Sequence, residues 1–443
     1  MAENVAHSIA QWQIIAAAAI FLSCYALIVS EKIHRSIIAL CGALLMILLG
    51  IVDLHAAYTN HIHWATIFLL LGMMILVGII NRSGIFEYIA VKTAQSAKGD
   101  PVKILVRLAI LTAVGSAFID NVTTVLLVAP ITIAIANTMR MNPVPFLITQ
   151  ILICNIGGAA TLVGDPPNIM IGLAAGFSFN QFLVHITPVI ILCIIVTNGF
   201  VKRYFAGHLH VDEQYKNILM EADARDYIRD SALAKKSIFI FAFTVLGFLT
   251  HQYVYVEPAT VALSGATLLM LIGTKGHEVE EVFNAVEWPT VFFFCGLFIL
   301  VGGLVEMGII KRIAVWMIEV TGGDVTRTAF IMLWGSGIGS AFIDNIPLVA
   351  TMIPMVHDMG AQLALAPAEI NTLWWSLALG ACLGGNGTII GSSANLIVAA
   401  IAAREGSPIT FINYLKVSIP VTLITLALAN IYIYIVYIRL GFA

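Results

Sequence analysis

The chain has very little charge for its length. Only 11% of its 443 residues are Asp, Glu, Lys or Arg, whereas 60% are hydrophobic, and a soluble domain carries about 25% charged residues. A soluble protein with a single core is therefore excluded, and the composition is that of a polytopic helical membrane protein. The net charge of −3 says little, because the charges of such a protein are divided between the two sides of the bilayer.

Motifs that would indicate an enzyme or a pump are missing. No Gly-x-x-x-x-Gly-Lys-Ser/Thr segment occurs, which argues against ATP-driven transport by this chain alone. The 11 histidines include no His-Glu-x-x-His pair, and the 6 cysteines lie in apolar segments without the spacing of metal ligands. We therefore predict no enzymatic activity, no cofactor, no metal centre and no nucleic-acid partner.

Apolar runs that could cross a bilayer occur along the whole chain, and a crossing needs about 20 such residues. The candidate spans are 12–30, 34–52, 65–82, 146–176, 183–201, 237–254, 258–274, 288–305, 372–403 and 414–438. The first residues lack the basic segment and cleavage site of a signal peptide, so the first run is expected to remain in the membrane.

Two further apolar stretches, 103–139 and 327–360, each carry Asp-Asn in the middle and a proline in the second half. We interpret them as re-entrant hairpins, which enter the membrane and return to the same side. Non-helical backbone at such depth is tolerated only where it is buried in protein or faces water. Short amphipathic segments at 85–98 and 309–321 would lead into the hairpins along the membrane surface.

The positive charges favour hairpins that do not cross the membrane. If residues 31–33 face the cytoplasm, 18 of the 22 Lys and Arg residues fall on the cytoplasmic side, as membrane insertion requires. The candidate spans then place both termini outside. We predict a multi-pass protein of the cytoplasmic membrane, embedded in the lipid bilayer.

One segment of the chain occurs twice: residues 64–121 return without a gap as residues 288–345, 224 positions later. Because an odd number of spans separates the two starts, the second copy is inverted. The predicted parts are an N-terminal extra transmembrane helix (1–33), a first inverted repeat (34–203), a cytoplasmic linker with a connecting transmembrane helix (204–257) and a second inverted repeat (258–438). Such a repeat, with polar breaks at matching places, is typical of secondary transporters.

Three carboxylates lie inside the apolar segments, at Asp120, Asp165 and Asp344. No Lys or Arg lies deep in a predicted span to pair with them, and an unpaired charge there costs roughly 2.5–3.5 kcal/mol on insertion. A carboxylate persists at depth by lining water, binding a cation or holding a proton, so all three are candidate proton-coupling residues. The alternative is a structural role, since Asp caps helix N-termini and Asp-Asn turns a chain.

Two glycine-rich motifs interrupt the spans that follow the hairpins. Gly-Gly-Ala-Ala-Thr-Leu-Val-Gly-Asp-Pro-Pro-Asn runs from Gly157 to Asn168, and Gly-Gly-Asn-Gly-Thr-Ile-Ile-Gly-Ser-Ser-Ala-Asn runs from Gly384 to Asn395. Glycines are poor helix formers and the paired prolines remove two donors, so each span should break near mid-membrane. A broken helix exposes carbonyls on one half and amides on the other, with a positive dipole end where the second half begins.

The two hairpin tips and the two helix breaks should meet in one pseudo-symmetric site near the midplane, which opens alternately to each face of the membrane. The predicted substrate- and ion-binding residues are Asp120, Asn121, Thr123, Thr124, Asn155, Gly158, Thr161, Asp165, Asn168, Asp344, Asn345, Asn386, Thr388, Ser392, Ser393 and Asn395. The first repeat contributes more acidic and hydroxyl groups, since Asp165 aligns with Ser392 and Thr123-Thr124 align with Pro347-Leu348.

These motifs resemble those of the ArsB/NhaD permeases of the ion transporter superfamily, in the branch of the melanosomal P protein and the prokaryotic arsenite permeases. The resemblance covers residues 34–438. It implies an all-α polytopic fold with two inverted-topology repeats, about ten transmembrane helices, two re-entrant hairpins and two discontinuous helices. It also implies a homodimer in which each protomer has a scaffold domain and a transport domain.

The predicted function is proton-coupled efflux of arsenite or antimonite, whose neutral hydroxides can be bound by amides, hydroxyls and carbonyls. The alternatives are a sodium–proton antiporter and an anion or dicarboxylate carrier. At the hairpin tips aspartate stands where the related dicarboxylate carriers have serine, which favours a proton or cation as the coupling species. A channel or a membrane-bound enzyme does not explain the paired inverted breaks, and help from an ATPase partner stays open.

Overall fold

The computed structural model describes residues 10–30, 32–209, 211 and 213–442, so that residues 1–9 and 31 of the predicted N-terminal segment lie outside the described residues. The part of the chain that the structure describes is helical and contains no β-strand. Eight of its helices are long and apolar enough to cross a membrane, and four shorter apolar helices accompany them. The all-α polytopic prediction is confirmed.

The two repeats contain matching series of helices. After α1 (Gln11–Ser30), the first comprises α2 (Arg35–Leu48), α3 (Leu54–Ala56), η1 (Ala57–His61), α4 (Trp64–Arg82), α5 (Ile85–Ser96), α6 (Pro101–Phe118), α7 (Asn121–Thr138), α8 (Val144–Gly158), α9 (Pro166–Ala175), α10 (Phe179–His185) and α11 (Thr187–Phe205). A connecting part follows with η2 (Ala206–His208), α12 (Glu213–Glu221), η3 (Ala224–Tyr227) and α13 (Ser231–Val254). The second comprises α14 (Pro258–Gly273), η4 (Gly276–Glu278), α15 (Val279–Asn284), α16 (Trp288–Glu306), α17 (Ile309–Thr321), α18 (Val325–Phe342), α19 (Asn345–Leu363), α20 (Pro367–Gly384), η5 (Ile389–Gly391), α21 (Ser393–Arg404), α22 (Phe411–Tyr432) and η6 (Ile433–Arg439).

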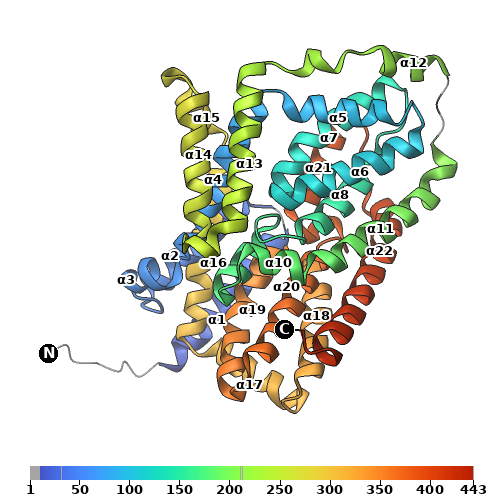
Figure 1. The fold of residues 1–443 in the computed structure, drawn as a ribbon. Helices are drawn as coiled ribbons and strands as arrows, with labels where there is room; N and C mark the ends of the chain where they lie inside the picture. Colours follow the sequence, from blue (N-terminus) through green and yellow to red (C-terminus); the bar gives the residue numbers. More distant parts are fainter. Residues whose placement is uncertain (1–9, 31, 210, 212, 443) are drawn as a thin grey trace.

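One bundle joins the first helices of both repeats by exchange. Helix α2 packs against α16 of the second repeat, and α14 packs against α4 of the first. Both helix pairs cross at short distance because a glycine faces the backbone of the partner helix. A Cβ atom added to Gly296 would lie 2.6 Å from the carbonyl carbon of Ala39, and a Cβ atom added to Gly72 would lie 2.7 Å from the carbonyl carbon of Ala262. We call α1, α2, α4, α13, α14 and α16 the scaffold bundle; its front members stand at the left of Figure 1.

The second body holds the hairpins and the interrupted helices. The predicted hairpins are the pairs α6–α7 and α18–α19, and the predicted breaks separate α8 from α9 and α20 from α21. The first arm of each hairpin packs on the first half of the interrupted helix of its own repeat, while α7 meets α21 and α19 meets α9 across the repeats. We call this part the hairpin body.

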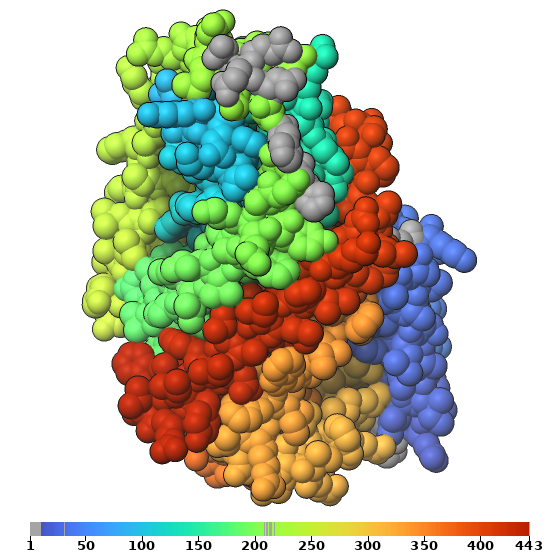
Figure 2. Space-filling model, turned by 90° about the vertical axis from the view of Figure 1, so that its right-hand side faces the viewer, coloured from blue at the N-terminus to red at the C-terminus, as the bar shows by residue number. Residues whose placement is uncertain are grey.

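The two repeats run in opposite directions through the molecule. In Figure 1, α5 lies along the upper part and α17 along the lower part, although both directly precede a hairpin. On the side face, α22 of the second repeat lies beside α11 of the first (Figure 2). The inverted arrangement brings the two hairpins toward each other from opposite ends, so that their tips meet in the interior.

Candidate functional site

Each hairpin turns at an aspartate that caps its second arm. Asp120 Oδ1 accepts a hydrogen bond from the Thr123 backbone N–H at 2.9 Å, and its Oδ2 accepts one from Thr123 Oγ1 at 2.5 Å. At the second tip, Asp344 Oδ1 accepts from the Ile346 N–H at 3.1 Å. Capping is therefore one role of both carboxylates, since it satisfies amides that a helix N-terminus leaves free.

The two helix breaks are held by an asparagine on the far side of each interruption. Asn168 Nδ2 donates to the carbonyl oxygens of Ala159 at 3.0 Å and Thr161 at 2.9 Å. At the second break, Asn395 Nδ2 donates to the carbonyl oxygens of Gly385 at 2.8 Å and Thr388 at 2.9 Å. The carbonyls that a broken helix leaves free thus have donors from within the same break.

Hydroxyl groups join each break to the hairpin of its own repeat. Thr388 Oγ1 donates to the Ala341 carbonyl oxygen at 2.5 Å, and Thr161 Oγ1 donates to the Ala117 carbonyl oxygen. Gly158, the last residue of α8, packs against Gly164 across the first break. A Cβ atom added to Gly158 would lie 2.7 Å from the Gly164 carbonyl oxygen. Within each repeat, the break is therefore hydrogen-bonded to the first arm of the hairpin close to its tip.

The tips of both hairpins converge on Asp165, which is fully buried at the end of the first break. Asn121 Nδ2 of the first tip donates to Asp165 Oδ1 at 3.1 Å, and Asn345 Nδ2 of the second tip donates to Asp165 Oδ2 at 3.2 Å. A buried carboxylate needs such donors, because removing a charge from water is costly. The carboxylate of Asp165 is thus hydrogen-bonded to the hairpin tips of both repeats.

Asn155, in α8, extends the network into the second break. Its Nδ2 donates to Asn386 Oδ1 at 2.9 Å and to Asn395 Oδ1 at 2.8 Å, while its Oδ1 accepts from Ser392 Oγ at 3.2 Å. Of the remaining predicted residues, Thr124 donates locally to the Ile119 carbonyl oxygen at 3.2 Å. The predicted residues are thus brought together, while their binding of substrate or ion stays a prediction.

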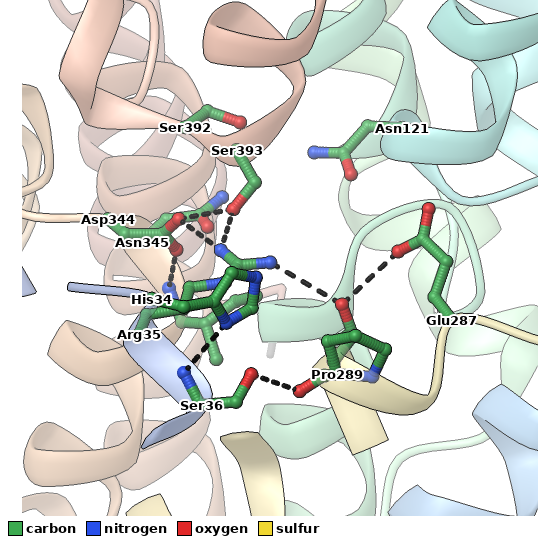
Figure 3. A network of polar contacts seen from close by, with 12 residues as sticks. His34, Arg35, Ser36, Asn121, Glu287, Pro289, Asp344, Asn345, Ser392 and Ser393 are labelled. Carbon is green, nitrogen blue, oxygen red and sulfur yellow. Dashed lines mark hydrogen bonds and ion pairs between the residues drawn. The ribbon is translucent and has the colours of Figure 1, made fainter. Parts of the chain in front are cut away.

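The expectation that the buried carboxylates have no basic partner is wrong for Asp344. Arg35, the first residue of α2, places Nη1 3.1 Å from Asp344 Oδ2. The same Nη1 donates to Ser393 Oγ, which also donates to Asp344 Oδ2. Because α2 packs on α16 beside the second hairpin, Arg35 reaches the hairpin tip (Figure 3).

The Arg35 guanidinium is also held from the scaffold bundle. Its Nη2 lies 3.4 Å from Thr290 Oγ1, and the guanidinium carbon lies 4.9 Å from the centre of the Phe293 ring. Thr290 Oγ1 in turn donates to Glu287 Oε2 at 3.2 Å. In the described residues Asp120 has no such basic partner, so the two pseudo-symmetric tips differ in charge.

A cavity of about 420 Å³ opens beside this ion pair. It is lined by Ile28, Val29, Ile33, His34, Arg35, Glu287, Pro289, Thr290, Asp344, Ile390, Ser393, Leu396 and Ile397. A second cavity of about 320 Å³ shares Glu287 and contains Thr123 of the first tip. Glu287 therefore borders spaces that reach both hairpin tips.

Sequence reasoning missed Arg35, Glu287 and Thr290. Glu287 directly precedes Trp288, where the second copy of the repeat begins, and Thr290 lies two residues later, a position that could have marked them. Arg35 had no such signal, because a basic residue at the start of an apolar run is ordinarily a surface charge.

Comparison with known proteins places the chain among transporters. The family model for citrate transporters, CitMHS, matches residues 25–380. An uncharacterized transporter of Mycobacterium bovis is 40% identical, the match covering 96% of this chain and 98% of that protein. The human P protein is 29% identical, the match covering all of this chain and 62% of the P protein.

A solved structure has the same fold. The YdaH transporter of Alcanivorax borkumensis, described as having an unusual topology, has a TM-score of 0.57 at 12% identity, covering 97% of this chain and 99% of the other. The likeness to the P protein agrees with the resemblance noted from the motifs, while placement in the ArsB/NhaD branch stays a prediction. Because the family match covers most of the chain, the protein is a membrane transporter, not an enzyme, and belongs to the citrate transporter family CitMHS.

Proposed function

We propose that this transporter carries a small carboxylate anion and couples its movement to protons. The observation that carries the proposal is the Arg35 guanidinium in the wall of a cavity of about 420 Å³, at the second hairpin tip. A guanidinium is the side chain best shaped to bind a carboxylate, through two parallel hydrogen bonds. The hydroxyls of Thr290 and Ser393 line the same cavity and can donate further bonds.

Arg35 also offsets the repulsion that the aspartate of the second tip would exert on an anionic substrate. The guanidinium offsets the charge of Asp344, and Asp165 is offset by two amide donors without a full positive charge. The citrate in the description of the matching family supports the same substrate class. Protons are the coupling species we propose, because three buried carboxylates border the tips and breaks.

Arsenite or antimonite efflux coupled to protons is the second candidate. The thiols of Cys154 and Cys382 are fully buried beside the Asp165 network, and Cys382 Sγ donates to Asn168 Oδ1 at 3.4 Å. Arsenic binds thiols, and the surrounding amides suit a neutral hydroxide.

Purified protein in proteoliposomes tests these readings against one another. Labelled citrate, succinate, arsenite and sodium are offered separately under an imposed pH gradient, with protein-free vesicles as the control. We expect the pH gradient to drive accumulation of a carboxylate. If arsenite or sodium accumulates and neither carboxylate does, carboxylate transport is refuted.

A further inference from the structure

The ion pair between Arg35 and Asp344 joins the two bodies of the protein. Arg35 belongs to the scaffold bundle through α2, whereas Asp344 and Ser393 belong to the hairpin body. Arg35 Nη1 lies 3.1 Å from Asp344 Oδ2, and the two side chains retain 23% and 10% of their exposure because both border the cavity. A ligand in the cavity can therefore reach the guanidinium directly.

Asp344 occupies the place that a substrate carboxylate would take on Arg35. Besides Asp344, the guanidinium's hydrogen-bond partners among the described residues are the hydroxyls of Ser393 and Thr290, and it lies over the Phe293 ring. The Phe293 ring positions the guanidinium without offering a competing anion. In Figure 3 the carboxylate that meets the Arg35 guanidinium is the protein's own, that of Asp344.

We propose that Arg35 binds the substrate carboxylate and that Asp344 is a built-in competitor, displaced when it takes up a proton. This inference rests on the proposed function and assigns its binding and coupling residues. Each bound carboxylate is balanced by one proton transferred from solvent to Asp344, and no covalent bond other than that O–H bond forms or breaks. The protonated carboxyl keeps a hydrogen-bond partner in Ser393 Oγ, which already lies against it.

The charges around Asp344 favour this exchange. Arg35 and His34 face the cavity from the start of α2, and Glu287 faces it from the start of α16. Asp165 and the Tyr25 hydroxyl of α1 are also close enough to interact electrostatically with Asp344. A substrate carboxylate added to an ionised Asp344 would place two anions on one guanidinium with Glu287 nearby, and one proton removes that repulsion.

Calorimetric titration of the full-length protein in detergent with citrate and with succinate tests the assignment. We expect the affinity of the wild-type protein for either anion to fall about tenfold for each unit by which the pH rises, over the range where one proton is taken up per bound anion. The titration is repeated in buffers of different ionisation enthalpy. The dependence of the measured binding enthalpy on the buffer gives the number of protons taken up per bound anion. Asp344→Asn, which keeps the shape and loses the charge, should bind tightly with no pH dependence and no proton uptake.

Removing Arg35 alone would leave Asp344 without its partner, so the decisive variant is Arg35→Gln combined with Asp344→Asn. We expect this double variant to melt near the wild-type temperature. It should bind either anion about 100-fold more weakly than Asp344→Asn does, because it lacks the charge-assisted bond from Arg35. The matched control is Arg439→Gln, because Arg439 also lies over an aromatic ring, that of Tyr434, and does not line the cavity; it should bind like the wild type.

The outcomes separate this inference from the proposed function. Wild-type binding of a carboxylate that persists in the double variant overturns the role of Arg35 and leaves carboxylate transport standing. An unchanged pH slope in Asp344→Asn overturns the role of Asp344 in the same way. A wild-type protein that neither binds nor transports citrate or succinate overturns the proposed function and the inference together.

Discussion

The crossing between α6 and α8 leaves no room for a side chain at Gly157. A Cβ at this position would lie 2.5 Å from the Ala113 carbonyl oxygen and 2.6 Å from the Ala113 Cα, whereas an ordinary contact is 3.4–4 Å. In Gly157→Ala the two helices must therefore separate by about 1 Å, and overpacking of this size costs about 1–3 kcal/mol. We expect a lower melting temperature of the purified protein in detergent.

The same substitution should also impair transport, because α6 leads directly to the first hairpin tip. Asn121 Nδ2 lies 3.1 Å from Asp165 Oδ1, and a shift of about 1 Å would take this pair beyond hydrogen-bond distance. The tip would then lose one of its links to the buried carboxylate. We expect uptake in proteoliposomes to fall about tenfold, the effect of about 1.4 kcal/mol in a transition state.

Two further glycines make this a controlled test. Gly384 is the counterpart of Gly157 in the second repeat, where a Cβ would lie 2.2 Å from the Gly337 carbonyl oxygen, so Gly384→Ala should behave like Gly157→Ala. Gly335, inside α18, has nothing within 4 Å of such a Cβ, and Gly335→Ala should stabilise the helix by about 1 kcal/mol. Melting and transport of Gly157→Ala equal to those of Gly335→Ala would refute the reasoning.

Three other outcomes follow from the network and its surroundings. Asp165→Asn places a donor against the amides of Asn121 and Asn345, so we expect loss of uptake driven by an imposed pH gradient; undiminished uptake would remove Asp165 from the mechanism. Asn395→Ala leaves the buried Gly385 carbonyl without its side-chain donor, while the Thr388 carbonyl keeps the Gly391 N–H; at about 1–3 kcal/mol for one unpaired group, denaturant unfolding should show a loss of about 1–3 kcal/mol, and an unchanged midpoint contradicts this. Outside the spans, the backbone N–H of Lys275 holds the pKa of Glu278 below its usual 4.5. The stability that this interaction adds is present above pH 4.5 and is lost as the pH falls through the lowered pKa of Glu278. Glu278→Gln should therefore flatten the acid side of a plot of melting temperature against pH. An unaltered plot would count against this assignment.

The hairpins and the helix breaks were predictable because their signals are local. A carboxylate in an apolar run, a glycine-rich segment or a pair of prolines each conflicts with a continuous buried helix, whatever surrounds it. The structure ends α8 at Gly158 and begins α9 at Pro166, within the interrupted motif, and turns both hairpins at the repeated Asp-Asn pair. The repeat spacing then indicates that the two sets are equivalent.

The partners of these groups were not predictable, since they come from helices far apart in the chain. Asn168 and Asn395 looked like binding residues, yet their amide donors are used by backbone carbonyls within the breaks. Arg35 and Asp344 are 309 positions apart and meet only because α2 crosses to the second repeat and packs on α16.

The amino-acid sequence by itself determined that this protein spans the membrane as two inverted copies of one unit, where the chain breaks, and which buried carboxylates its apolar segments carry. Only the tertiary structure decided which of those carboxylates has a cation beside it. The physical reason is that hydrophobicity and helix propensity act along the chain, whereas the partner of a buried charge is set by helix packing across the repeats.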